Sequence, residues 1–233
     1  STQGYSSAAS DVYKRQHPRT FLKSFHGICI TDGYQVYHTL EQEREDLQIA
    51  GCWAHVRRRY DEALKALPKE KRNQSTAHRG LVMIQAIYRN EKPLKELSAE
   101  ERRERRQLSV KPLVEAYFTW VHATIGQVMP KSKLWEGLNY SINQERYLKV
   151  FLENGNVPID NNASERSIRS FCIGRKNFVM IDTLHGAAAS AIIYSIAETA
   201  KANNLKPFDY FEYLLTELSL IHISEPTRQE AIS

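Results

Sequence analysis

Apolar and polar positions are arranged in two different patterns along this chain. Near the N-terminus, Gly27–Thr31 and Leu47–Cys52 are short and nearly continuous apolar runs, which is typical of buried strands. From Ala54 to Leu67 the apolar residues recur at helical spacing, and residues 68–155 continue this spacing almost without a break. The pattern predicts two strands followed by a long helical block.

Later segments give more local signals. Ser132 can cap a helix that follows Pro130. Glu100–Arg106 mixes acids and arginines at helical spacing, and the simplest interpretation is a solvent-exposed helix with ion pairs along it. Ala187–Ala202 predicts a further helix, and Pro207 begins the last one.

A dense group of cations follows a single acid in the C-terminal part of the chain. Glu165 lies three residues after Asn162, and Asn161 or Asn162 can accept the free N–H groups of a first helical turn, so one interpretation is a variant of the capping box. The other is a carboxylate held among cations that bind a polyanion. The cations are Arg166, Arg169, Arg175 and Lys176. Their density favours the second interpretation.

Asp32 stands at the end of the first predicted strand and precedes Gly33. An Asp-Gly turn explains the pair, but open α/β sheets also place their reacting groups at the carboxyl ends of strands. Further along, the run Arg57, Arg58 and Arg59 is either a solvated helix face or a set of phosphate contacts, and the sequence leaves both open.

Cys52 and His55 have the spacing of half a zinc site. No second Cys/His pair with such spacing follows, so a structural zinc ion is not expected. The chain has three cysteines, an odd and widely spaced set, which favours reduced thiols.

Four ordered blocks resemble transposases of the insertion-sequence-66 family. The blocks are Thr31–Tyr34 with Tyr37, Gly51–Arg58, Pro158–Arg166 with Gly174–Asn177, and Tyr194–Lys201. The resemblance covers about residues 20–217. It implies an α/β fold with an RNase H-like (retroviral-integrase-like) catalytic core, interrupted by a large all-helical insertion that makes this chain mostly α.

The resemblance also implies an Asp-Asp-Glu transposase that uses two Mg²⁺ or Mn²⁺ ions to cleave the phosphodiesters at transposon ends and to join the 3′-hydroxyl to a target. Asp32 matches the second catalytic and metal-binding aspartate, and Glu165 matches the glutamate. Two divalent ions can clamp the attacking and leaving oxygens of a phosphodiester. No block for the first aspartate precedes Phe25, so we expect this fragment to be truncated and inactive.

The remaining matched residues receive supporting roles. We expect DNA contacts from Arg166, Arg169, Arg175, Lys176, Arg57 and Arg58. We expect four further residues to support the structure of the motifs: Cys52, His55, Asn161 and Asn162. The implied partners are double-stranded DNA (transposon ends and target), further copies of the chain on that DNA, and helper proteins of the same element.

The net charge of +5 fits a nucleic-acid partner, and no apolar run has the length of a membrane helix. Together with these features, the resemblance implies a protein of the bacterial cytoplasm, associated with the nucleoid. Two alternatives stay open: a non-catalytic DNA-binding accessory protein, and an RNase H-like nuclease without strand transfer.

Both ends of the chain resemble translated sequencing adapters. We therefore predict that residues 1–16 and 218–233 are scars outside the fold. The predicted domains between them, in order, are a part of the catalytic core, the helical insertion, the closing part of the core and a C-terminal helical element. Their ranges are 17–53, 54–155, 156–185 and 186–217.

Overall fold

The computed structural model describes residues 18–166 and 184–224, in two compact units that divide after Asn162. The first unit consists of the described residues 18–162. The predicted domain boundaries after residues 53 and 155 both fall inside it. In the described parts of the chain, no helix has the length and hydropathy to cross a membrane.

Two parallel strands and the helix that connects them begin the first unit. β1 (Gly27–Thr31) pairs with β2 (Leu47–Gly51) in a register that sets Gly27 beside Leu47 and Thr31 beside Gly51. α2 (Gln35–Glu43) makes the crossover between them and buries Val36 and Leu40 toward the sheet's own small core. Both strands are therefore confirmed, whereas α2 was not predicted.

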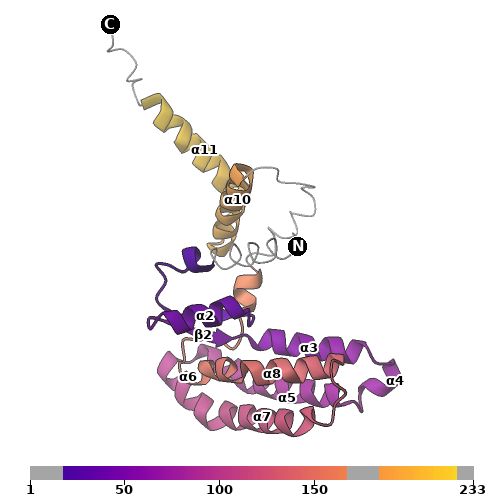
Figure 1. The fold of residues 1–233 in the computed structure, drawn as a ribbon. Helices are drawn as coiled ribbons and strands as arrows, with labels where there is room; N and C mark the ends of the chain where they lie inside the picture. The colour runs from indigo at the N-terminus through magenta and orange to yellow at the C-terminus, as the bar shows by residue number, and fades with distance from the viewer. Residues whose placement is uncertain (1–17, 167–183, 225–233) are drawn as a thin grey trace, which may run out of the picture. The chain divides into compact units, whose positions relative to one another are not determined.

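The predicted helical block is confirmed and fills the rest of the first unit (Figure 1). Its long elements are α3 (Trp53–Lys65), α5 (Thr76–Glu91), α7 (Lys111–Ile125) and α8 (Lys133–Lys149). Its short elements are α4 (Lys69–Arg72), η1 (Lys92–Glu96), α6 (Ala99–Arg105), the π-helical turn η2 (Arg106–Val110) and η3 (Val150–Leu152). Ser132 caps α8 as predicted, because its hydroxyl accepts the N–H of Trp135 at 3.2 Å.

The main core lies where α3, α5, α7 and α8 pack together. Aromatic rings from α3 and α7 meet there, with Trp53 and Tyr117 at 5.3 Å between ring centroids. The hydroxyl of Tyr117 forms hydrogen bonds with Tyr60 (3.1 Å) and Ser141 (2.7 Å), so its polar atom is satisfied although the side chain is fully buried. α8 also contacts β2, so the same core extends to the sheet.

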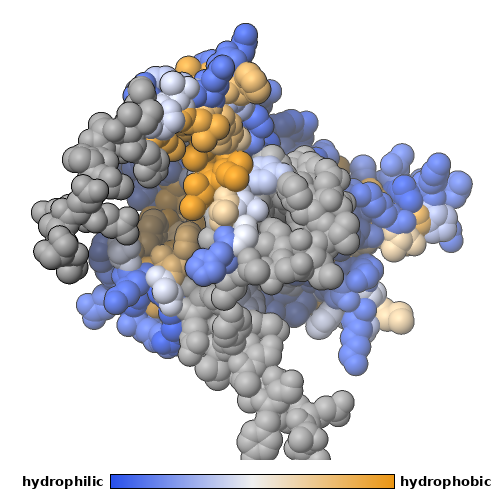
Figure 2. All heavy atoms as spheres, turned by 90° about the horizontal axis from the view of Figure 1, so that it is seen from above, coloured by the Kyte–Doolittle hydropathy of each residue, from blue (hydrophilic) through white to orange (hydrophobic). Residues whose placement is uncertain are grey.

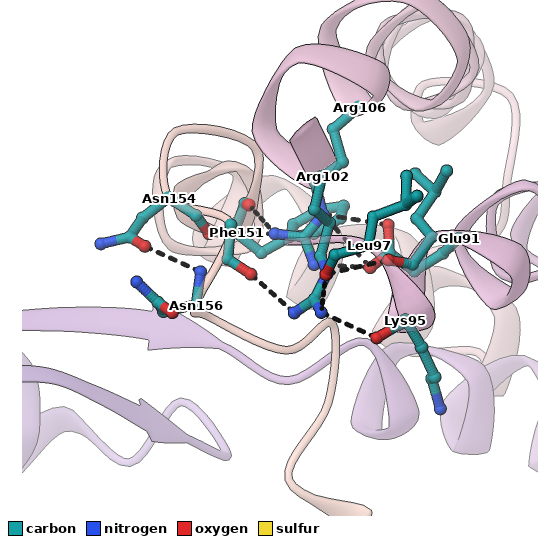
Figure 3. A network of polar contacts seen from close by, with 10 residues as sticks. Glu91, Lys95, Leu97, Arg102, Arg106, Phe151, Asn154 and Asn156 are labelled. Atoms are coloured by element: carbon teal, nitrogen blue, oxygen red, sulfur yellow. Dashed lines mark hydrogen bonds and ion pairs between the residues drawn. The ribbon is translucent and has the colours of Figure 1, made fainter. Parts of the chain in front are cut away.

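The prediction of a solvent-exposed helix at Glu100–Arg106 is wrong for two of its arginines (Figure 3). Arg106 is only 1% exposed and its guanidinium donates to the carboxylate of the buried Glu91. It also donates to the carbonyl oxygens of Phe151 (2.6 Å) and Asn154 (2.9 Å). Arg102 donates to the carbonyl oxygens of four residues, Leu94, Lys95, Leu97 and Gly155. The two arginines fix the loop that leads to Pro158.

The second unit is a pair of helices, α10 (Leu184–Ala202) and α11 (Pro207–Ser224). Asn204 lies between them with a positive φ of 58°, a conformation that ends helices. Figure 2 shows exposed hydrophobic residues among the hydrophilic ones. Large apolar residues of this unit with exposed side chains are Ile192, Ile193, Leu205, Phe208, Tyr213, Leu215 and Leu218. α11 runs through residues 218–224, which the sequence assigns to an adapter scar.

Candidate active site at the carboxyl end of the sheet

Asp32 follows directly after β1, at the carboxyl end of the parallel pair. Its side chain is exposed, and its Oδ1 accepts the N–H of Tyr34 at 3.2 Å, which forms an Asx-type turn. Gly33 has a φ of +85°, and a Cβ at this position would lie 2.9 Å from the side-chain Cδ of Gln144. The turn therefore needs glycine both for its conformation and for its close approach to α8.

Helix α8 holds this turn from the other side. The hydroxyl of Tyr140 donates to the carbonyl oxygen of Asp32 at 2.7 Å. Burial raises the pKa of Tyr140 to about 12, so its hydroxyl keeps its proton and stays a donor at neutral pH. The helical block thus positions the backbone that carries Asp32.

A hollow of about 660 Å³ lies beside the turn, and we refer to it as the strand-end hollow. Its lining residues are Asp32, Gly33, Tyr34, Gln35, His38, Arg59, Tyr140, Asn143, Gln144 and Tyr147. His38 is buried, stacks on Tyr147 at 3.9 Å between ring centroids, and has a pKa lowered by its burial. Since its imidazole is then neutral at pH 7, the charged groups of the hollow are Asp32 and Arg59.

The block that begins the C-terminal motif packs against the end of the second strand. The N–H of Cys52 donates to the carbonyl of Thr31 (3.1 Å), and the N–H of Trp53 donates to that of Ile159 (3.2 Å). The thiol of Cys52 is fully buried and donates to Oδ1 of Asn161 at 3.0 Å. Burial raises the pKa of this thiol, which keeps it protonated as a donor. The Cys52 and Pro158 blocks, far apart in sequence, are adjacent in the fold.

Trp53 connects the same region to α8, because its indole Nε1 donates to the carbonyl of Leu148 at 2.9 Å.

We predict that Trp53→Phe lowers the free energy of unfolding by about 1–3 kcal/mol, since a ring remains in the core but a buried carbonyl loses its donor. Urea unfolding followed by far-UV circular dichroism measures this loss. Trp135→Phe, outside the buried core, is the control and should cost less; equal losses would show that the hydrogen bond is unimportant.

Asp160 stabilises the turn from which the motif helix starts. The helix begins at Asn162, and Oδ1 of Asp160 accepts the N–H of Asn162 at 3.1 Å. The other oxygen of Asp160, Oδ2, accepts the hydroxyl of Tyr88 at 2.8 Å. Asp160 thus accepts a backbone N–H just before the helix, and Asn161 receives the Cys52 thiol. The capping roles of Asn161 and Asn162 stay predictions.

The remaining predicted site residues are distributed over both units. Glu165 and Arg166 begin the second unit, where Glu165 is half-buried and Arg166 is exposed. Since Asp32 belongs to the first unit, the shared metal site that the resemblance implies for Asp32 and Glu165 stays a prediction. Arg169, Arg175 and Lys176 lie outside the described residues. Arg57, Arg58 and His55 lie on α3, and both arginines are exposed.

The described residues do not form a two-metal site by themselves. Across residues 18–166 and 184–224, no three His, Cys, Asp or Glu side chains lie close enough together to hold an ion. The strand-end hollow supplies one carboxylate, that of Asp32, together with a guanidinium. Two divalent ions need more carboxylates than this.

Arg59, the third arginine of the run Arg57, Arg58 and Arg59, differs from the other two in its surroundings. Of the three consecutive arginines on α3, it is the one that lines the strand-end hollow, and its guanidinium lies over the ring of Tyr140 at 4.2 Å from the centroid. The helical spacing of the sequence already indicated this difference. Position 59 lies three residues after the buried Val56 and four before the buried Ala63, so it borders the packed face of α3.

One family model matches most of the chain. The chain matches the transposase IS66 family over residues 8–189. It is 31% identical over 205 residues to an uncharacterized protein, y4qI, of Sinorhizobium fredii, a match that covers 85% of this chain and 37% of the relative. A second uncharacterized protein of that organism, y4jD, is 26% identical over 202 residues, covering 84% of this chain and 39% of the relative.

This chain thus spans less than half the length of these relatives. No solved structure matches it. The family match contains three of the four sequence blocks in full, including the strand-end turn with Asp32 and the motif with Glu165. The chain belongs to the IS66 family of transposases.

Proposed function

We propose that the longer protein containing this chain cleaves DNA at the ends of its own mobile element and joins them to a target. Asp32 and Glu165 would serve as ligands of Mg²⁺ or Mn²⁺ in an RNase H-like core of the Asp-Asp-Glu type. The observation that carries the proposal is the place of Asp32: an exposed carboxylate at the carboxyl end of parallel strands, beside a hollow that contains an arginine.

Family membership supports the reaction class, and the local architecture supports the role of Asp32. Its Oδ1 is engaged by the N–H of Tyr34, and its backbone is held by Tyr140, so the carboxylate has a defined direction. Such fixed placement is what a ligand or reacting group requires. One carboxylate cannot hold two ions, so the proposal requires Glu165 and a further acid to reach the strand-end hollow.

The Pro158 block supports the approach of Glu165. Bonds from Cys52 and Trp53 fix Ile159 and Asn161 at the end of β2, a few residues before Glu165. Because β2 lies beside β1, this arrangement starts the motif helix at the same edge of the sheet as Asp32.

A joining assay tests the proposal. The full-length protein that carries this chain is incubated with a duplex ending in the element's own terminal sequence, a supercoiled plasmid and Mg²⁺. We expect plasmid with element DNA attached to it. Cleavage without joining would support the nuclease alternative, and binding without cleavage would support the accessory protein. Failure to bind DNA at all would contradict all three.

A further inference from the structure

The strand-end hollow contains an arginine that the fold itself does not use for an ion pair. The described residues offer the Arg59 guanidinium no carboxylate within ion-pair distance, whereas Arg102 and Arg106 donate to protein oxygens. Arg59 is half-buried on the packed side of α3 rather than extended into solvent. Its five N–H donors are therefore available to a ligand that enters the hollow.

The aromatic ring of Tyr140 holds this guanidinium in place. The Arg59 Cζ lies 4.2 Å from the ring centroid, a distance at which the cation and the π system attract each other. The same tyrosine donates its hydroxyl to the Asp32 carbonyl. One side chain thus fixes both the carboxylate-bearing turn and the cation that faces the same hollow.

Among the groups that line the hollow, an anion is attracted by Arg59. The carboxylate of Asp32 repels a phosphate, and the neutral imidazole of His38 carries no positive charge that would offset this repulsion. Among other nearby cations, Arg146 is 73% exposed, forms an ion pair with Glu41 at 3.3 Å, and is not part of the lining. Arg59 is therefore the group through which the described part of the hollow attracts a negative charge.

We propose that the strand-end hollow binds a backbone phosphate of the substrate DNA strand, with Arg59 as its ligand and Tyr140 as the support of Arg59. This inference rests on the proposed function, because it places the bound phosphodiester next to Asp32. A guanidinium presents parallel N–H groups that match two phosphate oxygens, which lysine cannot do. The contact positions the strand and does not read bases.

Fluorescence anisotropy with a labelled duplex of the element's terminal sequence, titrated at several salt concentrations, tests this contact. Arg59→Gln should weaken binding roughly tenfold and lower the salt slope by about 0.9, the value for one lost phosphate contact. Arg59→Lys should preserve the slope but weaken binding, since it keeps the charge and loses the paired donors.

Arg103→Gln is the matched control, because it removes the same charge from an exposed helix surface of the same unit and should leave binding unchanged. A second probe localises the contact: duplexes that each carry one uncharged methylphosphonate. When the methylphosphonate replaces the phosphate that Arg59 contacts, wild type and Arg59→Gln should bind that duplex equally. The wild type then lacks the charged phosphate, and the variant lacks the guanidinium.

The outcomes separate the two proposals. If the wild type binds DNA and Arg59→Gln binds with the same affinity and salt slope while its far-UV circular dichroism is unchanged, the inference is overturned and the proposed function stands. A uniform penalty at every methylphosphonate position would also overturn it, because it would indicate diffuse attraction. If the wild type binds no duplex at any salt concentration, both proposals fail.

Discussion

Replacing Arg106 with methionine should lower the free energy of unfolding of the first unit by about 3–5 kcal/mol. The change leaves the carboxylate of Glu91 buried without its cation, since Glu91 is only 3% exposed. It also removes the donors of the Phe151 and Asn154 carbonyls. Total stabilities of folded domains are of the order of 5–15 kcal/mol, so this loss is a large fraction of the whole.

Tryptophan fluorescence in urea measures this loss selectively, because all three tryptophans of the chain lie in the first unit. Arg103→Met is the control: its partner Glu100 is 68% exposed, so solvent screens this ion pair and we expect a much smaller change. If Arg106→Met unfolds at the same urea concentration as Arg103→Met, the network of Figure 3 does not stabilise the fold.

A double variant separates the two causes of the loss. In Glu91→Leu with Arg106→Met, no buried charge is left without a partner, so part of the stability should return. The carbonyls of Phe151 and Asn154 still lack donors, so the recovery should be incomplete. A complete recovery would show that the arginine's bonds to the loop after η3 contribute nothing.

The burial of Arg106 illustrates what a charge pattern cannot predict. Glu100–Arg106 has the spacing of an exposed helix, and Arg103 does pair with Glu100 at the surface. Arg106 instead meets Glu91, which lies on another helix, and the loop carbonyls of residues 151 and 154. Because these partners become neighbours only when the chain folds, spacing within one segment carries no sign of them.

Unlike the burial of Arg106, the two strands of the sheet could be predicted from the sequence. β1 and β2 could be predicted because each strand is a short, nearly continuous apolar run, which is typical of strands in a sheet. The connecting helix α2 was missed because it is short, with nine residues, and its buried residues Val36, His38 and Leu40 fall at every second position, a spacing typical of a strand. The parallel pairing itself requires a crossover connection, so two adjacent apolar runs already contained a reason to expect a helix between them.

The candidate site could be predicted in part, through the resemblance rather than through periodicity. The resemblance identified Asp32 as a site residue, and the structure places it where β1 ends. The roles of Tyr140 and Gln144 could not be predicted, because these residues belong to α8 and contact the turn only through the tertiary fold. The catalytic assignment of Asp32 and Glu165 remains a prediction.

Replacing Asp32 with asparagine should reduce DNA joining by the full-length protein at least about a hundredfold, because a group that offsets charge at a phosphodiester is worth several kcal/mol. Asparagine keeps an Oδ1 that can accept the N–H of Tyr34, so the turn, the thermal midpoint and duplex binding should change little. Glu45→Gln removes an equally exposed negative charge on the loop before β2 and should join DNA normally. The joining assay at fixed Mg²⁺ gives the rates, and anisotropy gives the affinities. If Asp32→Asn joins DNA as fast as Glu45→Gln does, Asp32 is a turn residue alone and the chemistry lies elsewhere in the protein.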